Sequence, residues 1–170
     1  MAVNTASGTK IFVGPATALS SIDWTTDETA LANFEAIAEG SWKVVGEVED
    51  FGEHGDSASD VTFTSVGDAR VRHLKGARDA GTLALVVGDD PLDEGQIALI
   101  AAEKTNFLYA FRIEYADARD ENHTDSVEYF LGLVMSRAKN VGTNDNVVRR
   151  TFSIGISSDI IEVLSEPISS

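Results

Sequence analysis

The stretch that decides the fold runs from residue 46 to residue 102. It begins with four segments: the acidic GEVEDFGEHGD (46–56), the alternating DVTFTSV (60–66), the basic turn RVRHLKGARDAG (70–81) and the apolar TLALVV (82–87). Apolar residues at every second position of 60–66 predict a strand, and the apolar run at 82–87 predicts a strand covered on both faces. The stretch closes with a predicted helix, so it reads as strands followed by one helix.

Period-2 patterns predict further strands outside this stretch. The cleanest pattern places Phe107, Tyr109, Phe111, Ile113 and Tyr115 on one face, which we interpret as core. The other predicted strands cover residues 10–13, 41–49, 126–135 and 148–157. Polar turns are predicted at 117–125 and 139–146, and the second is rich in Asn and Gly, as a tight hairpin loop requires.

The helix at the end of the deciding stretch is predicted to cover about residues 91–104. Asp90 can act as its N-cap, and Pro91 suits the first helical position because its ring presets the backbone angle φ. A run of strands with one amphipathic helix over an opening is typical of an α+β, mainly β fold. We therefore predict an antiparallel β-sandwich or barrel with one flanking α-helix.

A second, shorter helix is predicted between residues 26 and 38, where an ordered loop is the alternative. Thr25 and Glu28 have the spacing of a capping box just before the apolar positions of this segment. A chain of 170 residues can bury one core without being divided. The expected organisation is a flexible N-terminal arm at 1–9, one domain at 10–157 and a C-terminal tail at 158–170.

The charge balance excludes some classes of protein. The chain has 28 acidic and 13 basic residues and a formal net charge of −15. Binding to nucleic-acid phosphates needs a basic surface, so this balance argues against a nucleic-acid binder. Cysteine is absent, which excludes disulfides and thiolate metal sites. We see no secretory signal or apolar run of membrane-spanning length and expect a soluble protein that is made in the cytoplasm.

Motifs of catalytic or ligand-binding sites are not found in the sequence. His54, His73 and His123 have no metal-ligand partner at a useful spacing, and we interpret them as surface residues. The segment 56–60 has the spaced acids that begin a calcium loop, but it fails the EF-hand pattern because the required Gly at the sixth position and Glu at the twelfth are missing. Neither a phosphate-binding glycine loop nor a nucleophile elbow occurs. The sequence predicts no enzyme activity, no cofactor and no metal.

Several segments, in the same order, resemble the major tail tube protein of long-tailed bacteriophages with flexible, non-contractile tails. The most distinctive is the pattern KGxxDxGT, at residues 75–82, which precedes a strand. The resemblance covers about residues 41–115 and extends loosely to about 157. It is carried by 45–52, 61–65, 70–82, 90–96 and 109–112.

The resemblance implies a structural role in the virion. Proteins of this kind form hexameric rings in which neighbouring sheets join into a continuous β-barrel, and the rings stack into a hollow tube. The implied partners are other copies of the chain, the tape-measure protein, the tail terminator and the tail-tip proteins. DNA passes through the lumen without specific binding, and the tail is assembled in the host cytoplasm.

Two sets of residues are candidates for this role. If acids of the 52–65 segment meet the basic turn of an adjacent copy, the inter-subunit contacts are Glu53, Asp56, Asp60, Arg70, Arg72, Lys75 and Arg78. An acidic lining would keep DNA from adhering within about one Debye length, roughly 8–10 Å. The candidate lumen acids are Glu47, Glu49 and Asp50.

Two alternatives remain open from the sequence. A tube protein of a contractile tail or of type VI secretion would share the fold and the ring. A monomeric β-sandwich binding module would need exposed aromatic residues on a strand face, whereas Trp24 and Trp42 are isolated.

Overall fold

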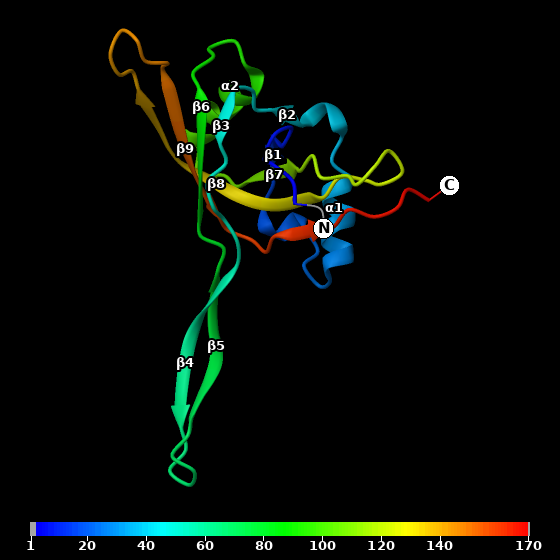
Figure 1. The fold of residues 1–170 in the computed structure, drawn as a ribbon, viewed down its shortest axis with the longest axis vertical. Coiled ribbons are helices and arrows are strands. Elements are labelled where there is room, and N and C mark those ends of the chain that lie inside the picture. The colour runs from blue at the N-terminus through cyan, green and yellow to red at the C-terminus, as the bar shows by residue number, and fades with distance from the viewer. Residues whose placement is uncertain (1–2, 170) are drawn as a thin grey trace.

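The computed structural model describes residues 3–169; the expectations for residues 1, 2 and 170, at the two chain ends, lie outside this range. The fold is α+β and mainly β, as predicted, with two α-helices beside the strands (Figure 1). The strands are β1 (Lys10–Ala16), β2 (Lys43–Val44), β3 (Val48–Asp50), β4 (Ser57–Thr64), β5 (Val71–Asp79), β6 (Thr82–Gly88), β7 (Tyr109–Glu114), β8 (Val127–Asn140), β9 (Arg149–Ile156) and β10 (Ile161–Val163).

Eight of these strands form one antiparallel sheet in the order β2-β1-β7-β8-β9-β6-β3, with β10 paired to the start of β8. Along β8, the partner β7 reaches only to Gly132, whereas β9 pairs from Gly132 to Asn140 on the opposite edge. We call β3, β6, β9 and residues 133–140 of β8 the open sheet. Among the described residues, no strand pairs with its outer edges at β8 and β3.

The main core lies between one face of the sheet and helix α2 (Glu94–Glu103). Alternate residues of β6 and β9 point into it, as the period-2 pattern predicts, and Leu99 and Ala102 of α2 close it. These side chains are removed from water almost completely, which is the main stabilising term of the fold. The strand residues are Leu83, Leu85, Val87, Phe152, Ile154 and Ile156.

A second core lies on the other face, where helix α1 (Asp27–Glu35) covers β7 and β8. Phe34 of α1 is fully buried and stacks on Tyr129 of β8, with ring centroids 5.4 Å apart. Neighbouring residues of β8 therefore serve opposite cores: Tyr129 faces α1, while Phe130 stacks on Phe111 in the main core. The first half of β8 is therefore buried on both faces.

Strands β4 and β5 form a separate hairpin that projects from one end of the molecule (Figure 1). We call residues 57–79 the arm. The predicted basic turn at 70–81 is wrong, because residues 71–79 are strand and the chain reverses at 65–70. A strand can carry these basic side chains because both faces of a two-stranded ribbon stay in water, where the charges remain hydrated.

Both helices differ from the prediction at their starts. Helix α2 begins at Glu94, and its N-cap is Asp93, whose carboxylate accepts the backbone N–H of Gln96 at 2.9 Å. Asp90 instead accepts the N–H of Leu92, so the preceding residues form a turn rather than the first helical turn. Helix α1 has Thr26 as N-cap, and its capping box pairs Thr26 with Thr29 rather than Thr25 with Glu28.

Several strand boundaries also differ from the prediction. The predicted strand at 41–49 is two short strands, β2 and β3, because Glu47 between them has a left-handed backbone (φ 56°). Phe107 precedes β7 and is 64% exposed, so its assignment to the core is wrong. Strand β8 continues to Asn140, inside the predicted turn at 139–146. Within the described residues, no helix has the length and apolar character needed to cross a membrane.

The two ends of the described chain lie against the body. In the C-terminal segment, β10 pairs with β8 and Ile161 is buried in the second core. In the N-terminal segment, the small residue Gly8 lies directly against Ala116, where a Cβ would approach to 2.8 Å. The flexibility expected for residues 1–9 stays a prediction.

Candidate assembly surfaces

The arm carries an apolar face that no part of the chain between residues 3 and 169 covers. Because Val61 lies opposite Leu74 and Phe63 opposite Arg72, these four side chains share one face of the ribbon. The three apolar ones are 48–57% exposed. Val66 at the tip is fully exposed as well. Contiguous exposed apolar side chains on a projecting element mark a surface that binds a partner.

Much of the predicted acid and base chemistry is paired within the arm and its root. Asp56 lies 3.2 Å from Arg78, and Asp60 lies 2.8 Å from His73. Arg72 pairs with Asp68, a residue that sequence reasoning did not consider. Arg70 and Lys75 form no ion pair with any described residue. They are therefore the basic candidates whose charge is available to another molecule.

The net charge of the arm differs from that of the body. The arm, residues 57–79, contains four Lys or Arg and three Asp, a net charge of +1, on a chain whose overall charge is −15. The opposite end of the molecule, where β6 leads toward α2 and the β8–β9 loop lies, is acidic (Figure 1). We call residues 46–50, 88–94 and 141–149 the acidic end. These segments contain eight acids and one Arg.

Contacts between these segments hold the acidic end together. Gly88 donates its N–H to the carbonyl of Glu47 at 2.8 Å, and the backbone N–H of Asp89 donates to the carbonyl of Val148 at 3.0 Å. Glu49 pairs with Arg149 across the sheet edge. The candidate lumen acids Glu47 and Glu49 thus lie at this end of the open sheet, whereas Asp50 pairs with Val86 of β6, nearer the middle.

The outer face of the open sheet has small and uncharged side chains along its middle. The residues that alternate with the core positions point to this face, and cross-strand partners such as Ala84 and Ser153 lie side by side. The charged residues Arg137 and Lys139 point the other way, to Glu103 and Asp89. The face is made of Thr82, Ala84, Val86, Thr151, Ser153, Gly155, Leu133, Ser136 and Ala138, together with the larger, exposed Met135 beside Gly155.

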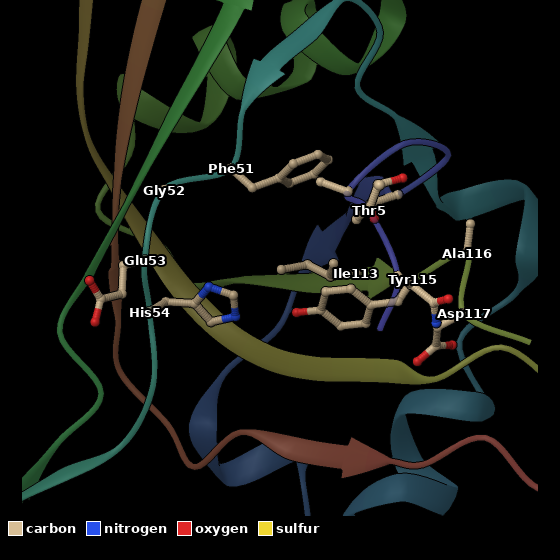
Figure 2. A pocket seen from close by; sticks show the side chains of 12 residues that line it. Thr5, Phe51, Gly52, Glu53, His54, Ile113, Tyr115, Ala116 and Asp117 are labelled. Atoms are coloured by element: carbon tan, nitrogen blue, oxygen red, sulfur yellow. The ribbon is translucent and has the colours of Figure 1, made fainter. Parts of the chain in front are cut away.

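A pocket of about 610 Å³ lies where the arm joins the body (Figure 2). Its lining includes Thr5, Phe51, His54, Ile113 and Tyr115. His54 and Tyr115 reach toward each other across it, one from the segment before the arm and one from the end of β7 (Figure 2). Glu53, a candidate contact residue, also lines this pocket, with its side chain pointing away from Tyr115 in Figure 2.

His54 belongs to a nearly buried cluster that sequence reasoning missed. Its Nε2 lies 2.7 Å from Glu128 Oε2, and the Tyr115 hydroxyl donates to the same oxygen at 2.9 Å. The side chains of His54 and Glu128 are only 11% and 16% exposed, so the interpretation of His54 as a surface residue is wrong. Residue 54 and residue 128 are too far apart in the sequence for any local pattern to connect them.

Ionisation in this cluster follows its contacts. Burial works to raise the pKa of the Glu128 carboxyl, but hydrogen bonds from His54 and Tyr115 hold that pKa below its ordinary value. Burial and the Glu128 charge raise the pKa of Tyr115. Among the described residues, no group of three or more His, Cys, Asp or Glu side chains is placed to hold a metal ion.

Comparison with known proteins gives matches only at the level of structure. No family model matches the sequence, and no curated protein matches it. The solved structure of the SPP1 tail tube is 16% identical and covers 94% of this chain and 76% of that chain, with a TM-score of 0.56. The chain has a tail tube fold. A second match with this fold is the anti-feeding prophage baseplate, 10% identical, covering 96% of this chain and 98% of that chain, with a TM-score of 0.64.

The tail tube fold gives the candidate surfaces a common meaning. Its matches are components of tails and baseplates, one of them described with six-fold symmetry. Unpaired strand edges, an apolar arm and an end of opposite charge are features that a monomer would normally avoid.

Proposed function

We propose that this chain is the repeating subunit of a hollow tail tube, built from hexameric rings that stack, in a long non-contractile phage tail. The observation that carries the proposal is the projecting arm, whose apolar face has no partner within the described chain. The tail tube fold supports it. The implied partners are the tape-measure, terminator and tail-tip proteins, and the implied location is the virion.

Within a ring, neighbouring subunits would join through the open sheet. Its β8 edge is unpaired from residue 133 to 140, and its β3 edge is only three residues long. Pairing the first edge with the second on the next copy satisfies backbone groups on both and closes after a fixed number of copies. The resulting barrel would turn the small, uncharged face of the open sheet toward the lumen.

Between rings, the arm of one copy would meet the acidic end of another. The two lie at opposite ends of the long axis, so identical copies can stack head to tail (Figure 1). Arg70 and Lys75 supply unpaired positive charge, and the acidic end supplies negative charge. Asp56, Asp60, Arg72 and Arg78 remain candidates for the joint, with their charges already paired inside the arm and its root. Glu53 also remains a candidate and lies at the root of the arm, beside the pocket.

The lumen would be a surface to which DNA does not adhere. Small neutral side chains offer neither positive charge nor stacking groups to a duplex, so passage meets no strong binding site. Glu47, Glu49 and Asp50 remain candidate lumen acids, the first two near the rim where one ring meets the next. Neutralising these three acids together should slow DNA ejection from assembled particles. Normal ejection would assign the acids to the stacking joint alone.

The main test is electron microscopy of concentrated protein in negative stain, together with a charge-reversed variant. Arg70→Glu with Lys75→Glu should abolish tubes while the folded monomer keeps its circular dichroism spectrum. A control with Lys104→Glu and Arg119→Glu makes the same change of charge on exposed body residues and should still form tubes. Unaltered tubes from the Arg70 and Lys75 variant would contradict the stacking joint.

The same micrographs separate the other candidates. A monomeric β-sandwich binding module would show neither rings nor tubes at any concentration. A tube from a contractile tail or from type VI secretion would form similar rings, and the genes beside this one would then distinguish those systems from a non-contractile tail.

A further inference from the structure

The arm is joined to the body by two short segments that contain hinge-type glycines. Gly52 and Gly55 lie in the segment that enters the arm, and Gly81 lies in the segment that leaves it. All three have positive φ angles, of 67°, 154° and 77°. Glycine adopts many backbone conformations at little cost, so these positions are points at which the arm can turn. The leaving segment is held more firmly than the entering one, because Ala80 is buried in the main core and the Gly81 carbonyl accepts the N–H of Ile156 at 3.1 Å.

One side-chain contact ties the entering segment to the centre of the sheet. His54 lies between Gly52 and Gly55, and its Nε2 is 2.7 Å from Oε2 of Glu128. Glu128 belongs to β8 and has β7 on one side and β10 on the other, opposite Ile113 and Glu162. The anchor is therefore a rigid strand, and the group it holds lies between two hinges.

Apart from His54 and Tyr115, few groups stabilise the negative charge of Glu128. Glu128 is 16% exposed and accepts hydrogen bonds from His54 and Tyr115 on one oxygen. The other charged groups around Tyr115 and Glu128 are acids, Glu162 and Asp117, and no Lys or Arg of the described chain pairs with Glu128. A nearly buried carboxylate in acidic surroundings is costly without hydrogen-bond donors, so the folded state favours the contacts of Glu128 with both His54 and Tyr115.

We propose that His54, Glu128 and Tyr115 form a latch that fixes the direction of the arm relative to the body. With the latch closed, the segment between Gly52 and Gly55 is held against β8 and the arm has one direction. With the latch broken, the arm turns at its glycines while the body keeps its fold, because His54 belongs to neither core and only its ring borders the main core, with its centroid 6.3 Å from that of Phe130. The latch is a property of the single chain and does not depend on tube assembly.

Spin-label distances test the latch directly. The chain contains no cysteine, so two labels can be placed without removing any native residue. Val66→Cys labels the exposed arm tip, and Ala32→Cys labels an exposed position on α1 of the body. The parent should give one narrow distance distribution. His54→Ala should at least double its width, while thermal unfolding of the body stays close to that of the parent.

A second histidine provides a matched control. His73 also pairs with a carboxylate, Asp60 at 2.8 Å, but both lie within the arm and are more than half exposed. His73→Ala should leave the distribution narrow. Glu128→Gln and Tyr115→Phe, which keep the shape of the site, should broaden it and serve if His54→Ala fails to fold. A folded latch variant with a distribution as narrow as the parent's would overturn the proposal.

Discussion

Asp89 and Arg150 meet at the acidic end, with Asp89 Oδ1 3.0 Å from Arg150 Nε and both side chains only 13–14% exposed. The second oxygen of Asp89 lies 2.7 Å from Lys139 Nζ, so one carboxylate joins the ends of β6, β8 and β9. The hydrogen bond from Lys139 holds the pKa of Asp89 below its ordinary value, against the effect of burial.

Asp89→Asn should therefore lower the free energy of unfolding at pH 7 by about 1 kcal/mol, because two cations lose their counter-charge. Chemical denaturation of both proteins measures the difference. The pKa of Asp89 is below its ordinary value of 3.8, so its ionised form stabilises the folded state above pH 3.8. This stabilisation is lost as the pH falls through the lowered pKa. A difference between the two proteins that grows toward low pH would contradict this assignment.

The stability of the chain should also depend on pH through Glu128. Its pKa is below the ordinary value of 4.5, so its ionised form stabilises the folded state above that pH. That stabilisation should be lost progressively as the pH falls through the depressed pKa, when the carboxyl takes up a proton. Glu128→Gln should remove this part of the acid dependence. Denaturation curves of both proteins between about pH 3 and pH 7 test the expectation, and parallel curves would refute it.

Gly95 should not tolerate a side chain. It lies in the first turn of α2, and a Cβ there would be 2.2 Å from the backbone carbonyl oxygen of Val44 in β2. Gly95→Ala should displace the helix from the sheet and cost about 2–3 kcal/mol, more than the helix propensity that alanine adds. Gly40→Ala is the control, because no atom lies within 4 Å of a Cβ there. Its unfolding free energy should change by less than about 0.5 kcal/mol.

Arg112 should be irreplaceable by lysine. Its guanidinium holds both oxygens of Glu39, at 2.9 and 3.1 Å, and lies over the rings of Phe12 and Trp42. Arg112→Lys keeps the charge but loses the two-pronged contact and the stacking, so we expect a loss of about 1–3 kcal/mol in unfolding free energy. Glu39→Gln, at a position where the side chain is 79% exposed, should cost less than Arg112→Lys, because solvent screens an exposed ion pair. Equal losses in the two variants would show that stacking contributes nothing.

Local patterns were sufficient to find most of the sheet. Apolar positions with a period of two located β6, β7 and β9. The expectation that β6 is covered on both faces is wrong, because Thr82 and Ala84 on its outer face are exposed, whereas β7 is buried on both faces. The same rule failed for residues 71–79. There both faces of the strand are exposed, so burial imposes no apolar pattern that would distinguish a basic strand from a basic turn.

Helix starts were predicted less well, because several residues can cap. Asp90 and Asp93 are both competent N-caps, and the choice of Asp93 follows from its second contact, to the N–H of Gly46 at 3.1 Å. That contact joins residues 47 positions apart. Likewise, the capping box of α1 uses Thr29, which also donates to the carbonyl of Asp23.

The sequence by itself determined the class of the fold, the main strands, the acidic balance and the position of the charged segments around the arm. Those properties depend on residues that are neighbours along the chain. Only the tertiary structure decided which charges are already paired, which sheet edges are open, and that His54 is held by Glu128 and Tyr115. These depend on contacts between distant residues, and chain folding creates such contacts by packing rather than by local pattern.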